Sequence, residues 1–333
     1  MQKKNIVMNR ILILCFLSAY LLLTSCASSG ETRMPMSIGS PGEVLIVIND
    51  HLWSGATGDS VRHYFTQPAW GLPAPEPMFK LLQVSTLSKF MQKFRSIVSI
   101  NIDPDLDGPA FRIRQDVYAQ NQIVYHLDAP SPDLLFADLE VKYELISTHI
   151  LLKLRESLIE ENTKIAAHQV MQRVREKFAV NIVIPRPYTL EVDEDNFVWI
   201  IREERERQWG ILIWEEPYEC TSQLETDSLI KSMNSVTMQH VPGKIEGSYM
   251  ATEPLLNPSV RRFEKNDDVY TVQLNGLWQM QNGFMGGPYV NHTIVDTNRG
   301  RLVTAVGFVF YPNRDKLQMV RQIEAILHSL TPM

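Results

Sequence analysis

The stretch Gly42-Glu43-Val44-Leu45-Ile46-Val47-Ile48 opens the folded part of this 333-residue chain. Five consecutive apolar residues follow Glu43, and no polar residue alternates with them. A strand with one wet face would show polar residues at every second position, so an unbroken apolar run is typical of a strand buried on both faces. The stretch therefore predicts a buried strand at the start of a packed core.

The residues upstream of this strand have the pattern of a secretory signal. Lys3, Lys4 and Arg10 precede an apolar segment over residues 11–23, which is shorter than the roughly 20 apolar residues of a permanent membrane span. Leu23-Thr24-Ser25-Cys26 ends that segment and resembles the lipobox of bacterial lipoproteins. We predict a signal peptide over residues 1–25, lipid attachment at Cys26 and a flexible tether over residues 26–41. An uncleaved anchor and a signal peptide cut elsewhere remain open.

The lipobox resemblance implies a location and a first partner. In such proteins the cysteine carries several acyl chains, such as palmitate, and several chains anchor a protein stably where one does not. No Asp directly follows Cys26, and no dense acidic cluster follows it either. The expectation is therefore a cell-envelope protein whose partner is the membrane lipid, anchored in the outer membrane and facing the periplasm.

Charge and cysteine content exclude some classes of protein. Removal of Lys3, Lys4 and Arg10 leaves 29 basic against 38 acidic side chains, a formal charge of −9. This balance argues against nucleic acid as a partner, because nucleic acid selects clustered Lys and Arg. Cys220 is the only cysteine left beside Cys15 of the signal and Cys26, so it has no intrachain disulfide partner. Stability must come from packing, and the length predicts about two domains.

A long helical segment divides the chain. Ser131-Pro132-Asp133 is a strong helix start, and residues 133–180 contain neither Gly nor Pro while apolar residues recur at helical spacing. We expect this helix to be broken once or twice. The predicted units are an N-terminal α+β half over residues 42–180, which includes the helical stretch, and a C-terminal α+β half over residues 181–333, which ends in a helix over residues 314–330.

The two halves show a similar order of elements. A strand, an acidic loop and a capped helix occur around Asp59 and again around Asp227, and each half ends with a strand, a Pro-containing turn and an amphipathic helix. We predict an α+β fold of two similar, mainly antiparallel α/β sandwich halves joined by the long helical segment. The alternative is that common supersecondary patterns produced the likeness by chance, and different strand orders in the two halves would exclude duplication.

Several motifs together resemble one known family. It is an uncharacterised lipoprotein family of Bacteroidetes-type bacteria, catalogued only as a domain of unknown function. The resemblance implies location and architecture, not an activity or catalytic residues. The motifs are Gly42–Ile48, Trp53 with Gly58-Asp59, Leu72-Pro73 with Glu76-Pro77 and Phe79, Phe197-Val198-Trp199-Ile200, Gly247-Ser248-Tyr249-Met250, Gly276-Leu277-Trp278 and Met285-Gly286-Gly287-Pro288.

One glycine-rich and aromatic loop is the main candidate for ligand binding. Glycines allow close approach of a partner, and Trp, Phe, Met and Tyr supply apolar contact area without charge. The alternative is a β-bulge and turn whose aromatic residues complete the core. The candidate residues are Trp278, Phe284, Met285, Gly286, Gly287 and Tyr289.

A calcium loop is a weaker candidate. Asp103, Asp105 and Asp107 alternate and are followed by Gly108, as at the start of a calcium loop. The twelfth position should be Glu but is Arg114, which favours a tight turn instead. No cofactor motif is present, so no cofactor is expected.

Two functions remain from different classes. The leading hypothesis is a non-enzymatic binding or scaffold module that recognises an envelope protein, peptide or glycan through the C-terminal half. The alternative is a hydrolase of envelope polymers, with a site assembled from residues distant in sequence such as Glu246, His292 and Asp296.

Overall fold

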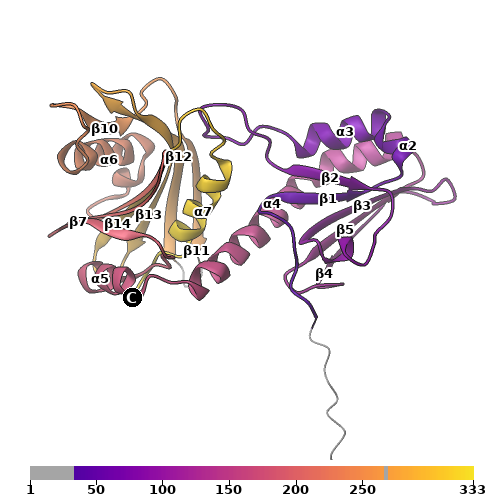
Figure 1. Ribbon diagram of the computed structural model, residues 1–333, viewed down its shortest axis with the longest axis horizontal. Coiled ribbons are helices and arrows are strands. Elements are labelled where there is room, and N and C mark those ends of the chain that lie inside the picture. The colour runs from indigo at the N-terminus through magenta and orange to yellow at the C-terminus, as the bar shows by residue number, and fades with distance from the viewer. Residues whose placement is uncertain (1–33, 266–268) are drawn as a thin grey trace, which may run out of the picture. The chain divides into compact units, whose positions relative to one another are not determined.

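Two β-sheets form the scaffold of the protein (Figure 1). The computed structural model describes residues 34–265 and 269–333, so the predicted signal peptide and Cys26 lie outside the described residues. Residues Met36–Met333 form one compact unit that holds both sheets. The α+β class is confirmed, whereas the predicted boundary at residue 180 stays a prediction. No described helix combines the length and apolar character that crossing a membrane requires.

The first sheet is mostly parallel and contains the strand that the sequence predicted. In β1 (Glu43–Val47), Val44, Leu45 and Ile46 are fully buried. Val44 and Ile46 pack in a cluster with helix α3 (Ala56–Phe65), and Leu45 packs on the opposite face, so the strand is buried on both faces as predicted. The strand order is β2 (Lys80–Val84), β1, β3 (Ser96–Ile102), β5 (Ile123–Ala129) and β4 (Ala110–Gln115), with only β4 antiparallel to its neighbour.

The apolar side of the long helix packs first against the first sheet and then against the last helix of the chain. Helix α4 (Pro132–Lys164) begins after Ser131, whose hydroxyl accepts a hydrogen bond from the backbone N–H of Leu134. The apolar stripe is broken once, between Lys164 and helix α5 (His168–Phe178). The first part of α4 packs on the first sheet, while Leu154 and Leu158 pack against Ala325 of helix α7 (Leu317–His328).

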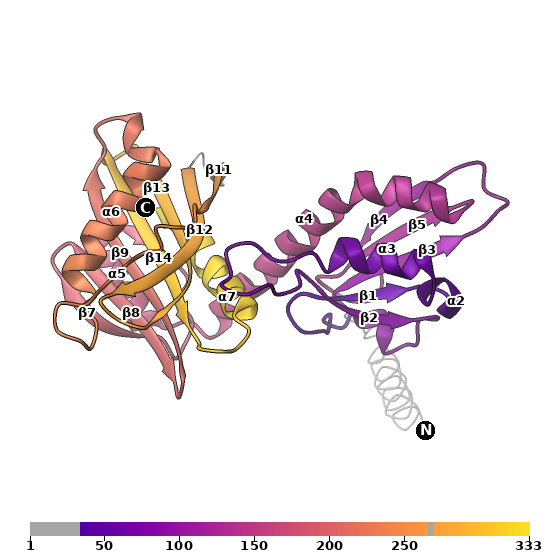
Figure 2. The same ribbon diagram turned by 90° about the horizontal axis from the view of Figure 1, so that it is seen from above.

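The second sheet is antiparallel and has helices on both faces. Helices α5 and α7 pack on one face, and helix α6 (Thr226–His240) packs on the other (Figures 1 and 2). Along each strand, side chains alternate between the two faces of the sheet. The same strands therefore contribute to the core beneath α5 and α7 and to the core beneath α6. The strand order is β10 (Tyr249–Thr252), β12 (Val269–Gln281), β13 (Gly286–Asp296), β14 (Arg301–Phe310), β9 (Arg207–Pro217), β8 (Phe197–Glu204) and β7 (Thr189–Glu194), with β11 (Ser259–Lys265) also on β12.

The smaller elements complete the chain. They are helix α2 (Asp50–Trp53), two 3₁₀ turns, η1 (Met91–Lys93) and η2 (Thr221–Leu224), and a two-stranded ladder of β6 (Val180–Asn181) with β15 (Thr331–Pro332). Asp59 was expected to cap a helix, but α3 begins at Ala56, and Asp59 instead lies in its first turn.

The expected likeness of the two halves is not found. The first sheet pairs β1 with parallel neighbours β2 and β3, which requires crossover connections. The second sheet is built from antiparallel neighbours such as β12, β13 and β14, which short turns connect. The strand orders differ, so the repeated strand, loop and helix pattern is common local structure and not a duplication.

Helix α7 is held at both ends by distant side chains. The carboxylate of Glu76, which is 8% exposed, accepts hydrogen bonds from the backbone N–H groups of Lys316 (2.7 Å) and Leu317 (2.9 Å). At the other end, Nζ of Lys265 donates to the carbonyls of Leu327 and Leu330, both at 3.1 Å. A carboxylate at the N-terminus and a cation at the C-terminus both complement the helix dipole.

We expect Glu76→Ala to lower the free energy of unfolding by about 2–4 kcal/mol, because two buried N–H groups lose a charged acceptor. Glu76→Gln keeps one carbonyl oxygen and should lose about half as much. Glu140→Ala on the exposed face of α4 is the control, with an expected change below about 0.5 kcal/mol. Denaturant unfolding measures all three, and equal losses for Glu76→Ala and Glu140→Ala would contradict this role of Glu76.

Stability should also depend on the protonation of Lys265. Burial and the neighbouring Arg155 lower the pKa of Lys265 to about 7, whereas an unfolded lysine has a pKa of about 10.4. Between these values the unfolded chain keeps a proton that the folded chain has lost, so rising pH favours the folded state.

The free energy of unfolding should therefore rise with pH between about 7 and 10.4, by at most about 1.4 kcal/mol per pH unit from this group. Lys265→Met should remove that part of the slope. Chemical denaturation over a pH series measures the difference, and identical pH dependence in the two proteins would be inconsistent with a deprotonated amine at this helix end.

Candidate functional site

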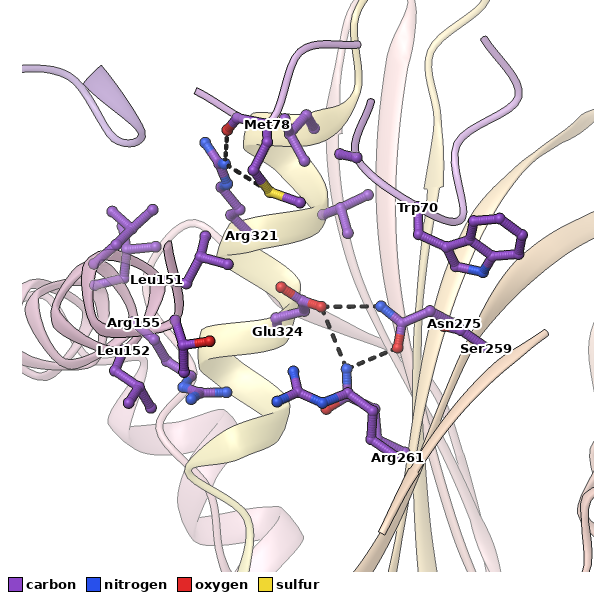
Figure 3. Close-up of a pocket in the computed structure, with 17 residues that line it drawn as sticks. Trp70, Met78, Leu151, Leu152, Arg155, Ser259, Arg261, Asn275, Arg321 and Glu324 are labelled. Carbon is purple, nitrogen blue, oxygen red and sulfur yellow. Dashed lines mark hydrogen bonds between the residues drawn. The ribbon is translucent and has the colours of Figure 1, made fainter. Parts of the chain in front are cut away.

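A cavity of about 230 Å³ lies between α4, α7, the β11–β12 pair and the loop after α3 (Figure 3). We call it the basic pocket, because its lining includes Arg155, Arg261 and Arg321 against one acidic residue, Glu324. All four elements belong to the compact unit Met36–Met333. The pocket is therefore built by tertiary packing of segments up to about 250 residues apart in sequence.

One wall of the pocket is apolar. Leu151, Leu154 and Leu158 come from α4, and Leu317 and Val320 come from α7. Leu154 and Leu158 also form part of the contact between these two helices, so the wall is the edge of a packed interface. This wall can accept an aliphatic group without rearrangement.

The loop after α3 closes one side of the pocket. Backbone hydrogen bonds from Ala69 to Glu76 and from Met78 to Gln67, each 2.8 Å, bring the two ends of this loop together. Trp70 lies on the loop, lines the pocket and is 68% exposed. Its indole therefore contacts the pocket and also faces solvent.

Next to the apolar wall lies a hydrogen-bonded polar network around Glu324. The Oε1 atom of Glu324 accepts from Nδ2 of Asn275 (3.0 Å) and from Nε2 of Gln273 (3.3 Å), as Figure 3 shows. Gln273 Nε2 also donates to Oδ1 of Asn275 at 2.7 Å. Gln273 and Asn275 are two residues apart on β12, so both side chains lie on the same face of the sheet.

Arg155 and Arg261 are the two guanidinium groups of the pocket that form neither a hydrogen bond nor an ion pair among the described residues. Within residues 34–265 and 269–333, neither guanidinium forms a hydrogen bond or an ion pair, and Figure 3 shows both reaching toward the side of α7 that carries Glu324. Burial lowers the pKa of Arg155, with Glu324 opposing and Arg261 adding to that effect. The two arginines thus lie close enough to repel each other.

More basic groups lie beneath the pocket. The His328 ring is 6.1 Å from the His292 ring, and Lys265 caps the helix that carries His328. Burial, followed by Arg155 and Lys265, lowers the pKa of His328 to about 3. Burial and Lys265 also hold the pKa of the His292 imidazole well below its usual value. Both imidazoles are therefore neutral at pH 7, and the positive charge comes mainly from the arginines, because Lys265 with its pKa of about 7 is only partly protonated.

Arg321 has a structural role at the edge of the pocket. Its guanidinium donates to the carbonyl of Met78 and lies 5.9 Å from the centre of the Phe79 ring. Gly42, with φ of +78°, leaves the room for it, because a Cβ atom there would lie 1.9 Å from Nη1 of Arg321. Burial lowers the pKa of Arg321 to about 10, which keeps it charged at neutral pH.

Two of the three aromatic candidates for ligand binding belong to the core. Trp278 and Tyr289 are each 2% exposed and pack in the cluster between the second sheet and α6. The indole Nε1 of Trp278 donates to the carbonyl of Val309 at 3.2 Å. Phe284, by contrast, is 99% exposed in the β12–β13 turn, and Met285 is half-buried against the core. The structure therefore gives Trp278 and Tyr289 the core role of the alternative interpretation.

The glycines of this hairpin serve strand packing. A Cβ atom on Gly287 would lie 2.1 Å from the carbonyl oxygen of Val309, and one on Gly286 would lie 2.9 Å from the carbonyl oxygen of Trp278. The backbone approached so closely is the protein's own. Gly286 and Gly287 are thus required by the β12–β13 pairing and the neighbouring strand, and no ligand is needed to explain them.

The three aspartates of the predicted calcium loop form a turn. The Oδ1 atom of Asp103 accepts from the backbone N–H of Asp105 at 3.1 Å, and the carbonyl of Asp103 accepts from Leu106. Among the residues that the structure describes, no group of three or more His, Cys, Asp and Glu side chains is arranged to hold a metal. Asp103, Asp105 and Asp107 are thus not brought together as ligands.

The structure also separates the three residues of the hydrolase alternative. His292 and Asp296 are four residues apart on β13, a distance of about 13 Å along a strand. Asp296 is buried and accepts from Arg301 at 3.0 Å, whereas Glu246 lies in an exposed turn before β10. No shared catalytic site results from these positions.

Sequence reasoning missed the basic pocket because its residues lie in ordinary elements. Arg155 belongs to the long helix and Arg261 to an edge strand, and neither has a motif around it. One signal was available in β12, where Thr271, Gln273 and Asn275 place three polar residues on one face of a long strand. A polar stripe on a covered strand indicates a buried network.

Comparison with known proteins gives families without an assigned function. Residues 37–162 match the model of a domain of unknown function, DUF8532, and residues 167–329 match that of another, DUF4837. No curated protein matches the sequence.

Two solved structures are similar over part of the chain. The crystal structure of LpqN, involved in cell envelope biogenesis of Mycobacterium tuberculosis, is 10% identical, with 46% of this chain and 83% of that chain covered and a TM-score of 0.27. The human StarD13 (DLC2) lipid transfer and protein localization domain is 10% identical, with 50% and 96% covered and a TM-score of 0.21. The predicted resemblance to a domain of unknown function is confirmed, because two models of such domains, DUF8532 and DUF4837, match successive parts of the chain.

Proposed function

We propose that this protein is a lipid-anchored binding module of the cell envelope and that the basic pocket binds an anionic organic ligand. The observation that carries the proposal is the pair of guanidinium groups, Arg155 and Arg261, which face one cavity and form no hydrogen bond or ion pair among the described residues. The apolar wall beside them supports a ligand with an aliphatic part.

Electrostatics favours an anion at this position. Two like charges held close together in a partly buried site raise the free energy of the empty pocket. An anion between them replaces this repulsion with charge-assisted hydrogen bonds, and guanidinium groups match carboxylate and phosphate oxygens in geometry. Lys265 beneath the pocket adds to the positive potential when it is protonated.

The shape of the pocket limits the size of the ligand. Its volume of about 230 Å³ lies below the roughly 300–1,000 Å³ of typical drug-sized sites. Leu151, Leu154 and Leu158 of α4 offer aliphatic contact, and the polar network comes from β12 and α7. A small carboxylate with an apolar chain fits both walls, and larger ligands would need part of the molecule to extend past Trp70.

The envelope location is supported by the sequence alone. Cys26 follows the lipobox-like residues, and the tether to the first strand is short. A tether of residues 26–41 reaches only about 50–60 Å when fully extended. The ligand would therefore be met close to the membrane that holds the lipid.

The anion-binding proposal can be tested with hexanoate as the probe. Hexanoate should raise the melting temperature of the wild-type protein, whereas hexylamine, with the same chain and the opposite charge, should not. Arg155→Met and Arg261→Met should each weaken hexanoate binding at least tenfold, since each removes a charge-assisted hydrogen bond of about 1.5–3 kcal/mol. Calorimetric titration measures the affinity.

The matched control is Arg114→Met, which removes an exposed arginine from the edge strand β4. It should leave hexanoate binding unchanged. Equal affinities in the wild type and both pocket variants would exclude anion binding at this pocket, and melting curves of the variants establish that they are folded.

The lipid anchor is tested by Cys26→Ala. In cells, the wild-type protein should be found in the membrane fraction and should incorporate labelled palmitate. Cys26→Ala should lose the label and leave the membrane fraction, because the acyl chains provide the anchorage. Cys220→Ala is the control and should behave as the wild type. Retention of the label in Cys26→Ala would rule out this attachment site.

A further inference from the structure

We infer that the ligand of the basic pocket is a free apolar α-amino acid, recognised through its carboxylate, its ammonium group and its side chain together. This inference rests on the proposed anion-binding function and adds the class of ligand. It comes from the position of Glu324, a carboxylate beside two unpaired guanidinium groups in one small cavity.

Half of the Glu324 carboxylate has no partner. Both amide donors, from Asn275 and Gln273, bind the Oε1 atom. Within the part of the chain that the structure describes, no donor binds Oε2. An ionised carboxylate can accept about four hydrogen bonds, so capacity for a further donor remains. A ligand ammonium group can donate to this oxygen.

The orientation of Glu324 is fixed by its neighbours. Gln273 Nε2 bridges Asn275 Oδ1 (2.7 Å) and Glu324 Oε1 (3.3 Å), so the three side chains form one connected network. Asn275 also lies next to the loop after α3, since a Cβ atom added to Gly71 would meet the Cβ of Asn275 at 3.4 Å. A carboxylate held in this way is a preorganised acceptor, which lowers the entropy cost of binding a cation.

Glu324 would act against a ligand that carries only negative charge. A simple carboxylate or phosphate placed at Arg155 and Arg261 would also lie near Glu324, and like charges at this range repel in a partly buried site. A ligand with an ammonium group one carbon from its carboxylate turns this repulsion into attraction. Glu324 therefore disfavours ligands that carry only negative charge, while Arg155 and Arg261 attract the carboxylate.

The apolar wall supplies the third contact. With the carboxylate at the arginines and the ammonium group at Glu324, the remaining substituent of the α-carbon faces Leu151, Leu154 and Leu158 or Leu317 and Val320. The small volume restricts this substituent to the size of one side chain. A peptide carries only one of the two charges at each end, so a free amino acid matches the three walls better.

The test is calorimetric titration of the full chain, purified in detergent, with four probes of similar shape. The probes are L-leucine, 4-methylpentanoate, which lacks the amino group, isopentylamine, which lacks the carboxylate, and the dipeptide Leu-Leu. We expect leucine to bind at least tenfold more tightly than 4-methylpentanoate and the dipeptide, and isopentylamine not to bind.

Variants separate the two charges. Glu324→Gln keeps an acceptor for the amides but removes the charge, and it should abolish the preference for leucine over 4-methylpentanoate. Arg261→Met should weaken the binding of both. Glu219→Gln, at an exposed position outside the pocket, should change neither affinity. The melting temperature of Glu324→Gln is measured in parallel, so a loss of structure is recognised.

The outcomes distinguish this inference from the proposed function. If 4-methylpentanoate binds as tightly as leucine and the arginine variants weaken it, the amino acid inference is wrong and anion binding stands. If Leu-Leu binds as tightly as leucine, recognition of a free amino acid is wrong. If neither leucine nor any carboxylate binds, both proposals fail.

Discussion

The hydrogen bonds from the N-terminus of α7 to Glu76 hold together segments that are 240 residues apart in sequence. Glu76 lies on the loop after α3, and its two carboxylate oxygens accept from the first free N–H groups of the last helix. Such N–H groups have no partner within their own helix, so a buried helix start depends on an acceptor from elsewhere. The position of α7, and with it the position of Glu324, depends on this contact.

The same helix connects the packing of the protein to its candidate site. On one side α7 packs on the second sheet, and on the other side Ala325 meets Leu154 and Leu158 of α4. Glu324 precedes Ala325, at the margin of the helix contact, where it meets the polar face of β12. The apolar contact between α4 and α7 and the basic pocket therefore lie side by side, and both depend on how α7 is packed. A change that loosens the helix pair would also disturb the pocket.

The basic pocket brings cationic side chains together with few acidic partners. Some buried charges in this protein are paired, as in the contact of Asp296 with Arg301. Arg155, Arg261 and Lys265, in contrast, lie close together, and for Arg155 the acidic neighbours Glu324 and Glu156 offset only part of this effect. Arg155 and Lys265 are half-buried and Arg261 is exposed, so the repulsion between them is partly screened by solvent, but it still favours an anion at this place. The clustering of positive charge is the physical reason for placing the ligand site at the basic pocket and not at the β12–β13 hairpin that carries Trp278 and Tyr289.

The sequence by itself determined the local structure. The unbroken run from Val44 required a buried strand, and Ser131 and Pro132 marked the start of the long helix. These features follow from side-chain periodicity and capping, which act over a few residues. Only the tertiary structure decided strand order, the core role of Trp278 and Tyr289, and the meeting of Arg155 with Arg261 and Glu324. Periodicity shows that a residue lies on a face but not which distant face covers it, and here that depends on how the loop after α3, α4 and α7 pack together.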